Sequence, residues 1–272
     1  MKKHLFSLTG RFDRLSKGSL SSSLSSFFSV FQNFLYPIRC PICGSVPPVS
    51  SFHSPDSPAL ICPSCYDSIT FVTQPFCYSC GKPLSDDEQE FCHDCTLHPK
   101  SFSRGFSLAV YDAVTQPSLA AIKYKNKRQY MNFYVQETIK RYEDLFLQLH
   151  FDAIFPVPIH PKRRKKRGFN QAELLAQELG KSLHLPVCDS VLIRTINTLP
   201  LKTLSPDKRL KSLEKAFSFP PGYEDAVLPY RRVLLVDDIY TTGATMEALT
   251  RLLKSHGVKE VYVFSICIGQ GL

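Results

Sequence analysis

The sequence predicts an α/β protein in which a doubly wound, mainly parallel sheet follows a small cysteine-rich module. Two observations support this fold class. From residue 100 onward, short apolar runs alternate with amphipathic helical patterns, as in parallel strands joined by helices. Between residues 40 and 95, eight of the ten cysteines form four pairs of identical spacing. We therefore expect a basic, serine-rich lead with a short helix over 1–35, the cysteine module over 36–99 and the α/β domain over 100–272.

The composition is that of a globular protein without a membrane segment. Apolar residues make up 43% of the 272 residues, which is enough for a hydrophobic core. No uninterrupted run of about 18 apolar residues occurs, so we expect no membrane partner. Arg11, Arg14 and Lys17 interrupt the region where a secretory signal would need an apolar segment. The sequence therefore favours a cytoplasmic protein.

Positive charge is concentrated in one segment. The net charge is +9, and residues 121–170 contribute +8 of it through twelve basic and four acidic side chains. These basic residues include Lys123, Lys125 and the unbroken run 162–167, which we expect to form a loop. Such clustering attracts polyanions, namely pyrophosphate, nucleic acid or both. The alternative is a solvated loop that only aids solubility.

The spacing of the paired cysteines is typical of structural zinc sites. Two residues between thiolates let both point at one metal ion, and two such knuckles complete a tetrahedral site. Sequential pairing would give one site from Cys40, Cys43, Cys62 and Cys65, and a second from Cys77, Cys80, Cys92 and Cys95. The sequence leaves open a cross-braced arrangement, in which the first knuckle joins the third.

Other roles for these cysteines fit less well. Disulfides need an oxidising compartment, and four regularly placed pairs are unlike a single redox motif. Because four thiolates close each site, we expect two structural Zn²⁺ ions and a module that folds only with its metals. His53, His93 and His98 are not needed as ligands. The isolated Cys188 and Cys267 are expected to pack as small apolar residues.

The elements of the α/β domain follow from hydrophobic periodicity. Apolar runs predict strands at 105–111 and 152–159, and two prolines close the second strand because proline cannot donate to a sheet ladder. Helical spacing predicts helices at 117–124, 132–150 and 172–183. A strand at 191–194 precedes a long polar loop, and the domain closes with a strand at 232–236, a helix at 245–256 and a strand at 260–268. In such folds the ligand lies at the carboxyl ends of the strands.

One strand end carries the strongest functional pattern. The strand at 232–236 runs into Asp237 and Asp238, and the sequence Thr-Thr-Gly-Ala-Thr follows at 241–245. Small residues that open a helix direct backbone N–H groups at one point, where the helix dipole favours an anion. The carboxylates repel a phosphate but suit sugar hydroxyls or a divalent cation. Together they describe a site for a ribose 5-phosphate. The alternative is that both Asp residues only cap a helix.

This stretch resembles the phosphoribosyl-pyrophosphate (PRPP) loop of the type I phosphoribosyltransferases. From about residue 30, the whole chain resembles the ComF family of competence-associated proteins, in which a zinc ribbon precedes a phosphoribosyltransferase-like domain. The matching segments are Pro37 with the following knuckles, Lys123-Tyr124-Lys125, Pro156-Val157-Pro158, Arg167-Gly168-Phe169-Asn170-Gln171 and the PRPP loop.

The resemblance implies a PRPP site with Mg²⁺. Asp237 and Asp238 would hold the sugar, and Arg167 would take the departing pyrophosphate, so these three are the candidate catalytic residues. The implied PRPP-binding residues are Asp237, Asp238, Thr241, Thr242, Gly243, Ala244, Thr245 and Lys125. Catalysis would then consist of positioning and charge stabilisation, with an acceptor that the sequence does not identify.

The chain departs from the family pattern in one loop. Residues 195–216 correspond to the mobile loop that closes over PRPP, but Leu201 and Ser212 replace a usual Gln and Asn. Turnover is therefore left open.

Two other functions remain open. One is a non-catalytic protein that binds single-stranded DNA, with Tyr124, Tyr130 and Phe169 available to stack on bases. The other is an adaptor whose zinc ribbon docks a competence helicase. The interpretation that the sequence favours is a PRPP-binding protein that acts in DNA uptake or processing.

Overall fold

The computed structural model describes residues 37–48, 60–197, 206–223 and 227–270. The expected lead over 1–35 and the departure at Leu201 lie outside these residues. None of the described helices has the length and hydrophobicity needed to cross a bilayer.

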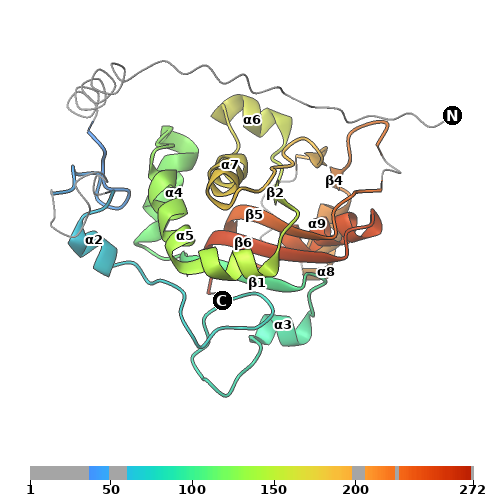
Figure 1. The fold of residues 1–272 in the computed structure, drawn as a ribbon, viewed down its shortest axis with the longest axis horizontal. Helices are drawn as coiled ribbons and strands as arrows, with labels where there is room; N and C mark the ends of the chain where they lie inside the picture. The colour runs from blue at the N-terminus through green and yellow to red at the C-terminus, as the bar shows by residue number, and fades with distance from the viewer. Residues whose placement is uncertain (1–36, 49–59, 198–205, 224–226, 271–272) are drawn as a thin grey trace, which may run out of the picture. The chain divides into compact units, whose positions relative to one another are not determined.

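The core of the described chain is a four-stranded parallel sheet, as the sequence predicts (Figure 1). Its strand order is β1 (Arg104–Val110), β6 (Glu260–Ile268), β5 (Arg232–Tyr240) and β2 (Ala153–Pro156). Successive residues of a strand face opposite sides, so each apolar strand contributes to two hydrophobic clusters. In β5, for example, Leu234 belongs to one cluster and Leu235 to the other.

Helices cover both faces of this sheet. Helices α4 (Thr115–Lys125), α5 (Tyr130–Leu149) and α7 (Gln171–Leu183) supply buried residues to the cluster that contains Leu234. Helices α8 (Pro206–Glu214) and α9 (Ala244–Ser255) supply residues to the cluster that contains Leu235. The doubly wound architecture is therefore confirmed.

The cysteine module does not have a core separate from that of the sheet. Its short helices are α2 (Pro63–Asp67) and α3 (His93–Leu97). Between them, Val72 N–H donates to the Leu108 carbonyl at 2.9 Å and Val110 N–H donates to the Thr70 carbonyl at 2.8 Å, so this segment pairs with the outer edge of β1. Cys40, Cys62 and Cys65 lie against the cluster on the α5 side of the sheet, and the second four cysteines join the cluster on the α9 side. The sheet and the module thus share both hydrophobic clusters.

Two segments differ from the sequence-based expectation. The basic run is a helix, α6 (Pro161–Arg167), rather than a loop. His160 Nδ1 caps it by accepting from the Lys162 N–H at 3.1 Å, and Gly168 ends it in the left-handed conformation. The strand near 191–194 is the two-residue β3 (Ile193–Arg194), which pairs antiparallel with β4 (Phe217–Ser218) outside the main sheet. Helix α8 lies within the region expected to be a loop.

Candidate functional site

The cysteine thiols form two clusters that match the sequential pairing. One contains Cys40, Cys43, Cys62 and Cys65, and the other Cys77, Cys80, Cys92 and Cys95, with ligand atoms within 4.8 Å of one another in each. The cross-braced alternative is therefore excluded. The Cys43 and Cys62 sulfurs are 3.7 Å apart, and those of Cys80 and Cys92 3.6 Å. A disulfide would need about 2 Å, whereas tetrahedral Zn²⁺ with bonds of about 2.3 Å spaces its sulfurs by about 3.8 Å. The clusters fit two zinc ions.

The two carboxylates lie within β5, which continues past the predicted strand end to Tyr240. Asp238 is 7% exposed, and its carboxylate forms an ion pair with Lys123, with 2.7 Å between Oδ2 and Nζ. Asp237 is half-buried. Burial, followed by repulsion from Asp238, raises the pKa of Asp237 to about 8, while Lys123 opposes this shift. At neutral pH, Asp237 therefore holds a proton more readily than an ordinary carboxyl group.

Lys123 contacts the Asp238 carboxylate, although the sequence argument assigned PRPP binding only to Lys125 of the same segment. It lies near the end of α4, and burial lowers its pKa, but Asp238 and Asp237 raise it by more, so the net shift is upward. The positive charge of Arg167 lowers the pKa of Lys123, so the Arg167 guanidinium lies within electrostatic range of the Lys123 ammonium group. Lys125, which was predicted to bind PRPP, lies two residues further along α4 and is exposed. The Lys-x-Lys spacing could have indicated that only one lysine faces the carboxylates.

The predicted phosphate loop joins β5 to α9. Gly243 is the residue before the helix, with φ of +73°, and a Cβ there would meet the Tyr240 hydroxyl at 2.0 Å. Glycine is therefore required on two counts, conformation and space. Thr241 is exposed, and Thr242 and Thr245 are half-buried. The first N–H groups of α9 face this turn without helical partners, as an anion site needs.

Two arginines lie within electrostatic range of the carboxylate–lysine group, Arg167 of Lys123 and Arg194 of Asp237. The Arg167 Nη1 group donates to Gln171 Oε1, and its guanidinium lies 5.5 Å from the centre of the Tyr124 ring. Arg194, in β3, was not predicted. Burial and the neighbouring Arg163 lower its pKa, while Asp237 raises it, so Arg194 lies within electrostatic range of that carboxylate. Arg194 also lines a pocket of about 530 Å³, together with Pro158 and Arg164 among others.

The chain matches two family models. A double zinc ribbon domain covers residues 31–96, and a phosphoribosyl transferase domain covers residues 165–269. The second match includes the carboxylate pair, the phosphate loop and Arg167, whereas Lys123 precedes it. The predicted fold class, a phosphoribosyltransferase-like fold preceded by a cysteine-rich zinc-ribbon module, is thereby confirmed.

Several curated proteins are similar over most of the chain. Competence protein F from Haemophilus influenzae is 31% identical over 76% of this chain and 89% of its own length. Competence protein ComFC from Bacillus subtilis is 27% identical over 72% of this chain and 79% of its own. DNA utilization protein YhgH from Escherichia coli K12 is 28% identical over 76% and 89%. With its two cysteine clusters, its parallel sheet and these relatives, the chain belongs to the ComF family of competence-associated proteins.

Proposed function

We propose that this protein binds PRPP, or another phosphorylated ribose, together with Mg²⁺ at the carboxyl end of β5. The observation that carries the proposal is the arrangement of Asp237, Asp238 and the turn 241–245 along one continuous segment. In this arrangement, the loop N–H groups bind the 5-phosphate, and the carboxylates accept from the ribose hydroxyls. Because Asp237 is readily protonated in the empty site, a bound cation would favour its ionised form.

The basic side chains beside Asp237 suit the pyrophosphate group. Arg167 and Arg194 come from different elements, and both lie within electrostatic range of the carboxylate site. Mg²⁺, when bound, would supply charge neutralisation between the pyrophosphate and the sugar. The protein's own contribution would be to orient the ligand and to stabilise the leaving pyrophosphate. The acceptor of a transfer reaction is not identified by any described residue.

The biological role that we propose is DNA uptake or DNA processing in the cytoplasm. The relatives named competence protein F, ComFC and DNA utilization protein support this role. A binding face for single-stranded DNA is the second candidate function, and one observation favours it. Helix α6 carries six basic residues in succession, and Tyr124 beside Arg167 is 75% exposed and free to stack. Tyr130 and Phe169 are 6% and 9% exposed, so they do not offer a stacking face.

Calorimetric titration of the zinc-loaded protein with PRPP and Mg²⁺ tests the proposal. Asp237→Asn removes one carboxylate without touching the Lys123–Asp238 pair, and it should weaken binding about tenfold or more. Asp144→Asn, at an exposed position on α5, is the matched control and should bind as the parent does. Equal affinity for the parent and Asp237→Asn would contradict the role of the carboxylate. A second titration with single-stranded DNA at a fixed salt concentration tests the alternative.

A further inference from the structure

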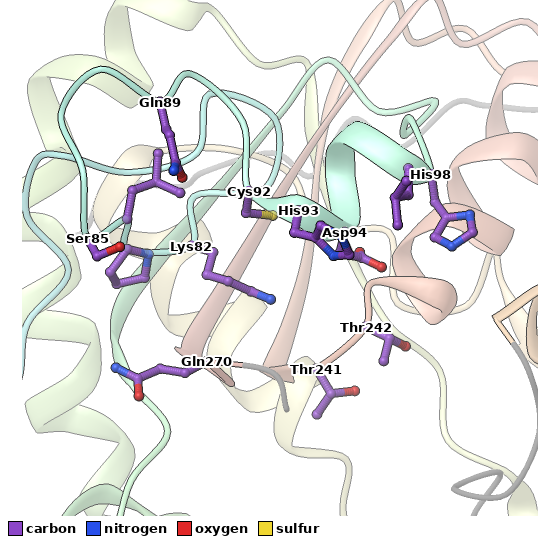
Figure 2. A pocket seen from close by; sticks show the side chains of 13 residues that line it. Lys82, Ser85, Gln89, Cys92, His93, Asp94, His98, Thr241, Thr242 and Gln270 are labelled. Atoms are coloured by element: carbon purple, nitrogen blue, oxygen red, sulfur yellow. The ribbon is translucent and has the colours of Figure 1, made fainter.

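A second pocket lies on the far side of the phosphate loop, against the second cysteine cluster. Its volume is about 460 Å³, which is sufficient for a nucleotide-sized ligand. Its walls include Lys82, His93 and Asp94 on one side and Thr241, Thr242 and Gln270 on the other. We call it the knuckle pocket. In Figure 2 the Lys82 side chain extends into the space between Asp94 and Thr241.

The charge in the knuckle pocket favours an anion. Asp94 already pairs with Lys100, whose Nζ lies 2.8 Å from its carboxylate. In the part of the chain that the structure describes, no carboxylate pairs with Lys82, which is half-buried. An ammonium group with three donors in a partly enclosed pocket is satisfied by an anionic ligand. Thr241, which is exposed, brings a hydroxyl group to the same pocket.

The fold holds Lys82 in a defined position relative to the phosphate loop. The Lys82 carbonyl accepts from the Cys77 N–H at 2.8 Å, so the lysine follows directly from a zinc knuckle. Gly81 has φ of +77°, and a Cβ there would lie 2.7 Å from the Gly105 carbonyl oxygen of β1. The knuckle therefore lies directly against the strand. Outside the pocket, the Ser101 N–H and hydroxyl donate to the Glu247 carboxylate in α9 at 2.7 and 2.6 Å, which ties the chain at the end of the cysteine module to the helix that follows the phosphate loop.

Polar groups elsewhere in the pocket suit the remainder of a larger molecule. Gln89 and Gln270 offer amide donors and acceptors, and Ser85 offers a hydroxyl group. Leu84 and Leu97 add apolar surface. A free inorganic anion would use only the ammonium and the hydroxyls. An ester with a heterocycle or sugar would also use the amides.

We propose that the knuckle pocket binds a second anionic ligand of the phosphate-ester class, of nucleotide size, with Lys82 as the anion-binding residue. The cysteine module would then form part of a ligand site in addition to stabilising the fold. Thr241 and Thr242 line the pocket, whereas Asp237, Asp238 and the first residues of α9 do not. Simultaneous binding of the second ligand and ribose 5-phosphate is therefore part of the proposal and is tested directly.

The test uses full-length, zinc-loaded protein and adenosine 5′-monophosphate as the probe. The protein is titrated in the presence of saturating ribose 5-phosphate and Mg²⁺, with inorganic phosphate titrated in parallel. We expect one further equivalent of the nucleotide to bind, more tightly than inorganic phosphate. Lys82→Gln should weaken this binding about tenfold or more, because a charge-assisted hydrogen bond is lost. Lys259→Gln, at an exposed lysine outside the pocket, is the matched control and should change nothing.

Three outcomes would overturn the proposal. They are failure of the parent to bind the nucleotide, equal affinity for nucleotide and inorganic phosphate, and full affinity in Lys82→Gln with unchanged zinc content. Asp237→Asn separates this result from the proposed PRPP function. It should lose ribose 5-phosphate affinity while retaining nucleotide binding in the knuckle pocket. If ribose 5-phosphate fails to bind the parent but the nucleotide still depends on Lys82, only the PRPP proposal falls.

Discussion

Asp238→Asn is expected to destabilise the protein, whereas Asp237→Asn is not. The Lys123–Asp238 pair is 2.7 Å long, with side-chain exposures of 19% and 10%. At an effective dielectric constant of about 20, the attraction amounts to about 6 kcal/mol, most of which offsets the desolvation of the two ions. Removing only the carboxylate leaves a largely buried ammonium group without its partner. We expect a loss of about 2 kcal/mol in the free energy of unfolding.

For Asp237→Asn, the expected change in the free energy of unfolding has the opposite sign. Its pKa in the folded protein is raised above the ordinary carboxyl value, so its ionisation lowers stability as the pH rises from that value towards about 8. Asp237→Asn should therefore leave stability unchanged at about pH 3, where the carboxyl group is protonated in both states, and raise it increasingly from about pH 5 to about pH 8.

Thermal unfolding of zinc-loaded protein at several pH values measures both effects. A loss of about 2 kcal/mol corresponds to a decrease of about 4–8 °C in Tm for a domain of this size. The double variant Lys123→Met/Asp238→Asn serves as the control, because it removes the unpaired ammonium and should recover part of the loss. Equal Tm values for Asp237→Asn and Asp238→Asn would refute the reasoning.

Three further predictions concern the phosphate loop, the metal sites and the basic helix. Gly243→Ala should lower Tm and abolish PRPP binding, whereas Gly222→Ala, with φ of +85° but no atom within 4 Å of the added Cβ, should cost only about 1 kcal/mol. Elemental analysis should give two zinc ions per chain. Chelation should melt the α/β domain as well as the module, as far-UV circular dichroism would report; a domain that stays folded would contradict the shared clusters. Neutralising 162–166 while keeping Arg167 should weaken single-stranded DNA binding and flatten its salt dependence in a fluorescence titration, with little effect on PRPP affinity. If PRPP affinity falls instead and DNA binding is unchanged, the basic run binds pyrophosphate and not DNA.

The sequence predicted the main sheet well because its strands are long apolar runs with clear ends. It also predicted the metal clusters, since the cysteine spacing reports ligand geometry directly. It could not show what packs against the knuckles. Ile61 and Ile69 look like ordinary loop residues in sequence, yet both are buried in the cluster of the sheet.

The errors at the site have physical reasons too. A run of lysines and arginines has no apolar periodicity, so α6 was missed although His160-Pro161 and Gly168 provide start and stop signals. Lys123 and Lys125 differ only in which side of α4 they occupy, and that depends on the helix boundaries. Arg194 approaches Asp237 through a two-residue strand, which is too short for periodicity to detect.

The strand order has a consequence for how the chain is made. β6 follows the other three strands in the chain, yet it lies between β1 and β5. Until it emerges from the ribosome, β1 has no neighbour in the main sheet, and no sheet hydrogen bonds join β1 to the β5–β2 pair. A nascent fragment that stops before residue 260 therefore exposes two unpaired strand edges and both apolar faces. Folding of this domain is expected to begin only after synthesis of its last strand.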